Sequence, residues 1–204
     1  FADFKIRTFP GGNTGVQMGG WFKRPITSLA DLKGLKMRIP GLGGEVMSEL
    51  GVSVQVIAGG EIFPALERGA IDATDWVGPY DDEKLGFHKA AEFYHYPGWW
   101  EPGPAMSYFV GTAAWEALPK AYQEMFRVAA LHSATVMQAR YDARNPAALK
   151  RLVAGGTKLK PFTQDLIAGA RDVAEQMYVD GAAADPAYNK VFEHWKAFRK
   201  ESFS

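Results

Sequence analysis

The sequence predicts an α/β fold built around a largely parallel β-sheet. In the N-terminal third, short apolar strands alternate with short helical segments, as in successive βαβ units. One strand is marked by Leu35, Met37 and Ile39, which alternate with Lys36 and Arg38. That period of two indicates a half-buried strand. Because a helix separates each strand from the next, neighbouring strands are expected to run parallel.

Local patterns predict the elements of this first part in order. Ser28 is the expected N-cap of a short helix, and Asp31 occupies the capping-box position three residues later. Pro64 is expected in the first turn of its helix, where proline is tolerated. The predicted segments are strands at 4–9, 35–39, 52–57 and 71–76, a Gly-rich loop at 10–20, and helices at 28–34, 43–51 and 60–69.

The second part is more helical. An aromatic and Gly/Pro-rich segment precedes a strand that ends near Val110, and a long helix is predicted from Pro119 to Asn145. Pro146 is expected to kink this helix. A short strand within 154–162 and helices at 163–182 and 185–202 complete the predicted elements, the last of them amphipathic.

Composition excludes several classes of function. The 204 residues are 47% hydrophobic and 23% charged, as in an ordinary globular protein. Lys plus Arg equals Asp plus Glu at 23 each, so no overall field attracts nucleic acid or acidic lipid. The chain has no Cys, which excludes disulfides, thiolate catalysis and zinc–thiolate sites. It begins with Phe1, so it is expected to be processed or cut from a longer protein.

Catalytic motifs offer little support for an enzyme. No Gly-rich segment has the spacing of a dinucleotide loop or a P-loop, and no Ser lies in a nucleophile elbow. The histidines show no metal-ligand spacing: His88, His95, His132 and His194. Any catalysis would therefore depend on carboxylates alone.

Polar residues instead gather at the predicted ends of strands. Gln17 lies in the Gly-rich loop, Arg38 lies near the end of the second strand, Asp75 and Trp76 end the fourth, and Glu101 follows the aromatic segment. Ligands of open α/β sheets bind at the carboxyl ends of strands. We therefore expect these residues to meet at one rim of the sheet.

Their chemistry is complementary. The planar guanidinium of Arg38 can hold a carboxylate by two parallel hydrogen bonds. Asp75, Glu101 and the amide oxygen of Gln17 are hard oxygen donors suited to sodium or calcium. Walls of aromatic side chains would exclude water from such a site, and the candidates are Trp76, Trp99 and Trp100.

Each residue also has a purely structural interpretation. Arg38 fits a solvated strand face, Asp75 a turn cap, Gln17 a polar loop and Glu101 a surface acid. Trp99 and Trp100 fit core packing better than they fit ligand walls. Asp81, Asp82 and Glu83 suit the first turn of a helix, where the dipole favours acids, and are interpreted as structural.

Several motifs together resemble one family. The segments "SLADLKGLKMRIP", "ALERGAIDATDW" and "YHYPGWWEPG" are similar, in order and spacing, to the solute-binding proteins of TRAP transporters, the DctP-type family. The details are most similar to its TakP-like branch, which binds 2-oxo and 2-hydroxy acids. The resemblance implies a periplasmic binding protein-like, two-lobed α/β fold of the type II kind, with a long kinked interdomain helix.

The resemblance also implies a role for each rim residue. Arg38 matches the arginine that clamps the substrate carboxylate. Gln17, Asp75 and the backbone carbonyl of Trp76 match a cation site in which the metal bridges protein and substrate, and Glu101 matches a further polar ligand. Asp75 stands where Glu is common in the branch. The shorter side chain leaves sodium and calcium as open alternatives.

Family members are longer than this chain, which resembles their C-terminal two thirds. The resemblance implies a nearly complete α/β lobe in residues 1–110, carrying the ligand rim. It places the long interdomain helix and a return strand in 111–160 and C-terminal helices in 161–204. The last helix resembles one that mediates homodimerisation.

The function implied is that of a non-enzymatic periplasmic receptor. It would capture a small organic acid with a cation and deliver it to the TRAP membrane permease subunits, with no nucleic acid involved. Two alternatives stay open: a metal-dependent lyase or hydrolase of 2-oxo acids, and a ligand-sensing module.

Overall fold

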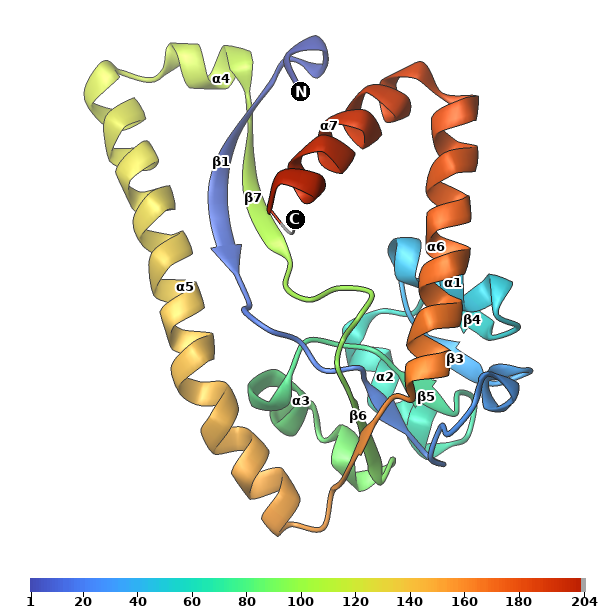
Figure 1. The fold of residues 1–204 in the computed structure, drawn as a ribbon. Coiled ribbons are helices and arrows are strands. Elements are labelled where there is room, and N and C mark those ends of the chain that lie inside the picture. The colour runs from blue at the N-terminus through green and yellow to red at the C-terminus, as the bar shows by residue number, and fades with distance from the viewer. Residues whose placement is uncertain (203–204) are drawn as a thin grey trace.

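Two separate β-structures and a set of long helices make up the chain (Figure 1). The architecture comes from a computed structural model, which describes residues 1–202. One sheet has six strands in the order β4-β3-β5-β2-β6-β8, and β1 and β7 pair as a two-stranded ribbon. The strands are β1 (Ile6–Asn13), β2 (Trp21–Phe22), β3 (Lys36–Arg38), β4 (Ser53–Gln55), β5 (Ala73–Thr74), β6 (Phe93–Tyr96), β7 (Ala105–Gly111) and β8 (Lys158–Pro161).

The six-stranded sheet is mixed rather than largely parallel. Strand β3 runs parallel to β4 and β5, as the βαβ pattern predicts. Strand β6, which the sequence prediction did not include, runs parallel to β8. Strand β2 is antiparallel to both of its neighbours, β5 and β6. The sequence prediction missed β2, because Trp21–Phe22 is too short to show any periodicity.

The first predicted strand lies outside the sheet. Strand β1 extends past the expected end at Phe9 as far as Asn13, and it pairs antiparallel with β7. Pro10 is tolerated because a two-stranded ribbon has edges that need no backbone donor, and the register shifts between Pro10 and Gly12. The Gly-rich loop therefore begins at Thr14 rather than at Pro10.

The helices follow the predicted pattern with two local corrections. Asp31 accepts the backbone N–H groups of Thr27 and Ser28, so the predicted capping interaction is present, although the helix is a 3-10 turn. Pro64 lies beyond the first turn of its helix. The helices are α1 (Gly41–Glu49), α2 (Gly59–Glu67), α3 (Pro79–Leu85), α4 (Thr112–Ala117), α5 (Lys120–Ala154), α6 (Gln164–Ala184) and α7 (Pro186–Ser202), with 3-10 helices η1 (Ala2–Phe4), η2 (Leu29–Leu32) and η3 (Phe87–Lys89).

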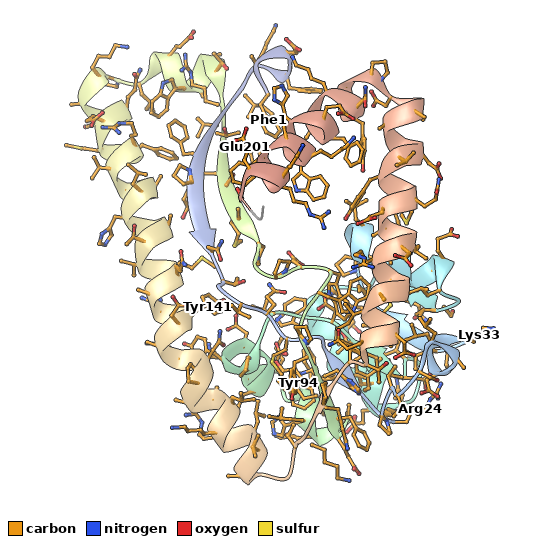
Figure 2. The ribbon with its side chains drawn as sticks, viewed as in Figure 1. Phe1, Arg24, Lys33, Tyr94, Tyr141 and Glu201 are labelled. Carbon is orange, nitrogen blue, oxygen red and sulfur yellow. The ribbon has the colours of Figure 1, made fainter. Side chains whose placement is uncertain are left out.

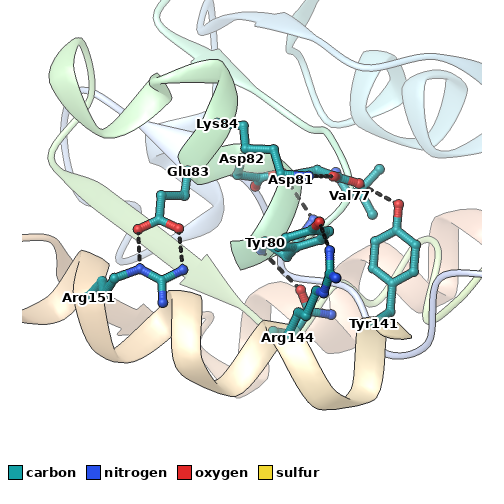
Figure 3. Close-up of polar contacts among 11 residues, drawn as sticks. Val77, Tyr80, Asp81, Asp82, Glu83, Lys84, Tyr141, Arg144 and Arg151 are labelled. Carbon is teal, nitrogen blue, oxygen red and sulfur yellow. Dashed lines mark hydrogen bonds and ion pairs between the residues drawn. The ribbon is translucent and has the colours of Figure 1, made fainter. Parts of the chain in front are cut away.

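Helix α5 is longer than predicted. It runs for 35 residues and continues through Pro146 to Ala154, so the expected end at Asn145 is wrong. Contacts with α3 hold the helix on both sides of the proline. Asn145 Oδ1 accepts the backbone N–H of Tyr80, and Arg151 forms a two-bond ion pair with Glu83 (Figure 3). The N-terminal half of α5 lies along β1 (Figure 1).

The two faces of the sheet carry separate apolar cores. Trp21 and Phe22 point to opposite faces, as adjacent strand residues must. Phe22 joins the core beneath α1 and α6, and Trp21 joins the core beneath α2 and the end of α5. Tyr94 lies among the crowded side chains around the six-stranded sheet, whereas Tyr141 lies on α5 (Figure 2).

The division into functional segments 1–110, 111–160 and 161–204 stays a prediction. In residues 1–202, no helix combines the length and apolarity that a bilayer span requires.

Candidate functional site

A pocket of about 230 Å³ opens where the six-stranded sheet meets the end of the β1–β7 ribbon. All five rim residues predicted from the sequence line this one pocket, together with residues that the sequence did not single out. The lining consists of Thr14, Gln17, Arg38, Pro40, Asp75, Trp76, Val77, Glu101, Pro104 and Met106. The structure therefore brings the predicted residues together, and their roles as ligands stay predictions.

Strand direction explains the convergence. Strands β3 and β5 are parallel, so Arg38 and Asp75 leave the sheet at the same edge. Strand β2 is antiparallel to β5, so its beginning lies at that edge and the loop containing Gln17 enters there. Strand β6 is antiparallel to β2 and ends at the same edge, which delivers the loop containing Glu101. The missed strand β2 is thus what positions Gln17.

A close backbone approach joins two of these loops. The Gly98 N–H donates to the Gln17 carbonyl oxygen over 3.3 Å. A Cβ atom at Gly98 would stand 2.7 Å from the Met18 carbonyl oxygen, closer than real Cβ atoms come. Glycine is required at this position, which helps to explain the Gly in the "GWWEPG" motif.

Asp75 is the buried acid of the pocket. Its side chain is only 2% exposed, and Oδ1 accepts a hydrogen bond from Trp100 Nε1 at 3.1 Å. Burial raises the pKa of Asp75 to about 7, whereas the Trp100 hydrogen bond lowers it and the Asp82 and Glu101 carboxylates raise it. A cation beside this carboxylate would offset its desolvation and stabilise the ionised form.

Arg38, on the neighbouring strand β3, contacts the backbone of Asp75. Its Nη1 donates to the Asp75 backbone carbonyl at 2.9 Å and its Nε donates to the Ile57 carbonyl at 3.3 Å. The guanidinium also stacks 5.0 Å from the centre of the Trp76 ring. Partial burial lowers the pKa of Arg38, although Asp75 and Glu101 oppose this shift. These contacts orient the guanidinium and leave Nη2 without a hydrogen bond among residues 1–202.

Gln17 presents an unsatisfied oxygen. The side chain is 3% exposed, and its Nε2 donates to Thr14 Oγ1 at 3.1 Å. Its Oε1 is buried and accepts no hydrogen bond in the part of the chain that the structure describes. A buried acceptor without a protein partner costs free energy, so this oxygen is available to a cation, a ligand or a water molecule.

The aromatic walls differ from the prediction. Trp76 lines the pocket, but Trp99 and Trp100 do not. Trp100 acts through its N–H bond to Asp75, and Trp99 packs with Trp100 against the core beneath α6. Glu101 lines the pocket and is half-buried, so it is not a fully exposed surface acid.

Asp82 is the group whose environment sequence reasoning missed. It lies in the first turn of α3 as predicted, yet it is 1% exposed rather than a solvated helix-cap acid. Burial raises its pKa to about 6 against the hydrogen bonds that it accepts. The signals available were the apolar neighbours Trp21 and Tyr94, which lie far from it in sequence and could not be assigned to it.

The donor set defines what the pocket can bind. Within residues 1–202 no cluster of three or more His, Cys, Asp or Glu side chains could hold a metal. Any cation here would need the amide oxygen of Gln17 and backbone carbonyls beside the two acids. All-oxygen sites of this kind suit sodium or calcium rather than zinc. The pocket thus combines oxygen donors with one guanidinium.

Sequence comparison identifies the class of protein to which this fold belongs. Residues 2–185 match the model of the family "Bacterial extracellular solute-binding protein, family 7", also called DctP, and the chain belongs to that family.

Individual relatives agree with this assignment. The chain is 57% identical, over all 204 residues, to the monocarboxylate 2-oxoacid-binding periplasmic protein of Nostoc sp. strain PCC 7120. A TRAP solute-binding protein from Bordetella bronchiseptica superposes with a TM-score of 0.94 at 45% identity over 98% of the chain; its crystal contains a mixed occupancy dimer with copurified calcium and picolinate. A TRAP periplasmic solute-binding protein from Pseudoalteromonas atlantica, with bound sodium and pyruvate, superposes with a TM-score of 0.92 at 40% identity over 98% of the chain.

The chain spans 56% of the Nostoc relative and 60% and 61% of the two solved chains.

Proposed function

We propose that the full-length protein is a periplasmic receptor of a TRAP transporter, which captures a small 2-oxo or 2-hydroxy carboxylate together with a cation. The observation that carries this proposal is the unpartnered Gln17 Oε1, buried in the same pocket as Asp75. A cation can satisfy a buried oxygen of this kind, and Arg38 is placed to hold the acid's carboxylate. The relatives with calcium and picolinate or sodium and pyruvate support this combination.

Charge balance gives a reason for the cation. Arg38 supplies one positive charge, while Asp75, Glu101 and a bound carboxylate supply three negative charges when ionised. The site then carries a net charge of 1 − 3 = −2 without a cation, about −1 with sodium and about zero with calcium. An anionic ligand would be repelled from a pocket that lacks the metal.

The chemistry of the pocket lining favours a small acid. Pro40, Val77, Pro104 and Met106 form the aliphatic part of the lining, beside the polar donors of the same pocket. A short 2-oxo acid presents one carboxylate and one adjacent keto oxygen, which suits a guanidinium beside a cation.

The receptor is proposed to be non-enzymatic, homodimeric and periplasmic, and to deliver its ligand to the TRAP permease. Isothermal titration of full-length protein with pyruvate and lactate tests binding, after chelation and with sodium or calcium restored. Saturable binding with no loss of the acid on prolonged incubation is expected. Turnover of pyruvate by pure protein would favour the lyase or hydrolase alternative, and no binding under any cation condition would refute the proposal.

A further inference from the structure

We propose that Asp82 is a positioning residue for the cation site, because it orients the Trp76–Val77 peptide so that the Trp76 carbonyl oxygen is available as a ligand. This inference rests on the proposed function, which supplies the cation. Asp82 does not line the pocket, and it would act only through the backbone that it holds.

Asp82 uses both of its carboxylate oxygens. Oδ1 accepts the backbone N–H groups of Val77 at 3.3 Å and Gly78 at 3.0 Å (Figure 3). Oδ2 accepts Trp21 Nε1–H at 2.9 Å and the Tyr94 hydroxyl at 2.7 Å. One oxygen therefore fixes the turn that follows Trp76, and the other anchors Asp82 to the core of the sheet.

The geometry of the Trp76–Val77 peptide relates these hydrogen bonds to the direction of the Trp76 carbonyl. The Val77 N–H and the Trp76 carbonyl belong to the same planar unit, and in a trans peptide they point to opposite sides. With its N–H directed at Asp82, the peptide must turn the Trp76 oxygen away from Asp82. That oxygen accepts no hydrogen bond from residues 1–202, and Trp76 itself lines the pocket.

The negative charge of Asp82 also makes the Trp76 carbonyl oxygen a stronger ligand for a cation. A carboxylate that accepts an amide N–H polarises that peptide and places more negative charge on its carbonyl oxygen. A harder, more negative oxygen is a better partner for sodium or calcium. A purely structural Asp82 would anchor α3 and affect only stability, so the two interpretations predict different measurements.

The first experiment compares two variants of the full-length protein. Asp82→Asn keeps the side-chain size but removes the charge, and an amide cannot satisfy all four donors. Calcium titration is expected to show an affinity about tenfold lower than wild type. At calcium concentrations that saturate the variant, pyruvate affinity should return to within about twofold of wild type.

Tyr94→Phe is the matched control. It deletes one hydrogen bond to Oδ2 and lowers the unfolding midpoint of the metal-free protein, but it leaves the Val77 and Gly78 contacts in place. Its calcium affinity should stay within about twofold of wild type. If both variants lose calcium affinity in proportion to their loss of stability, or if Asp82→Asn binds calcium normally, Asp82 has no positioning role.

A measurement on the wild-type protein covers the case in which Asp82→Asn fails to fold. The Val77 amide resonance should move on calcium addition, because the metal binds the carbonyl of the same peptide. A Val77 signal that stays in place while calcium saturates the protein overturns the inference but leaves the proposed function intact. If the wild-type protein binds neither calcium nor sodium, the cation part of the proposed function is wrong, and the inference about Asp82 is wrong as well.

Discussion

Trp100 Nε1–H donates a hydrogen bond to Asp75 Oδ1 over 3.1 Å, so an indole from the aromatic loop holds the buried acid at the end of β5. The bond fixes one carboxylate oxygen, and among the described residues no hydrogen bond engages Oδ2. It also opposes the effect of burial on the Asp75 pKa. Trp100, predicted to be an aromatic wall of the site, thus orients the Asp75 carboxylate through a hydrogen bond instead.

Trp100→Phe should weaken calcium binding by roughly threefold to tenfold, because a charge-assisted hydrogen bond that orients Asp75 is lost. Calorimetric titration of full-length protein measures the change. Trp99→Phe is the control, since the buried Trp99 Nε1 has no hydrogen-bond partner among residues 1–202. Equal losses for the two variants would show that ring packing, not the bond to Asp75, matters.

Arg38→Ala should abolish carboxylate binding and leave the fold intact. Loss of a charge-assisted pair from a partly buried site costs about 2–5 kcal/mol, or well over tenfold in affinity. Arg38→Lys keeps the charge but not the fork, and should restore only part of the affinity. Near-normal binding of every acid tested by the alanine variant would show that Arg38 is not the clamp.

Asp75→Asn should weaken cation and acid binding together, because each ligand supplies part of the other's coordination and the coupling is reciprocal. The measurement is pyruvate titration after exhaustive chelation in sodium-free buffer, repeated with calcium restored. Wild-type protein should bind pyruvate only in the second condition. Unchanged pyruvate affinity in the chelated wild type would remove the metal from the mechanism.

Helix α7 is predicted to mediate homodimerisation through an apolar stripe formed by Tyr188, Val191, Phe192, Trp195 and Phe198. Phe192 and Trp195 already pack on Tyr178 of α6, but Val191 and Phe198 remain 69% and 67% exposed. Light scattering should show that Val191→Glu and Phe198→Glu each produce monomers, as should a chain ending at Gly181. The truncated chain exposes Tyr178, so the substitutions are the cleaner test. Variants that stay dimeric would exclude this stripe as the main interface.

His95 should make the protein less stable as pH falls. Its Nε2 accepts the Ile26 N–H, its Nδ1 is buried, and burial lowers its pKa to about 4 from 6.5. Between these values the unfolded chain binds more protons than the folded one, so stability falls as pH drops through this window. The contribution lost between pH 7.5 and 5 is about 2 kcal/mol.

Denaturant unfolding of wild type and His95→Gln at both pH values isolates this effect, because the raised pKa values of Asp75 and Asp82 act in both proteins. Glutamine can accept the Ile26 N–H without binding a proton. Wild type should therefore lose about 2 kcal/mol relative to the variant at the lower pH. The exposed His132→Gln serves as control. A pH-independent difference between wild type and His95→Gln would contradict the assignment.

Local patterns determined most of the elements. The alternation around Lys36–Arg38 and the Ser28–Asp31 cap are effects between near neighbours in the chain, so the sequence alone was enough to predict them. The family motifs likewise identified Gln17, Arg38, Asp75, Trp76 and Glu101 as one candidate set before any geometry was known.

Tertiary structure decided the rest, because the forces involved act between distant segments. Strand β2 is defined by pairing on both sides, and its antiparallel direction brings Gln17 to the rim. Helix α5 passes through Pro146 because its partners on α3 compensate for the lost backbone bond. Asp82 of α3 is buried because Trp21 of β2 and Tyr94 of β6 pack against it and donate hydrogen bonds to it. Desolvation and long-range hydrogen bonds depend on the whole fold, so no local sequence pattern could reveal them.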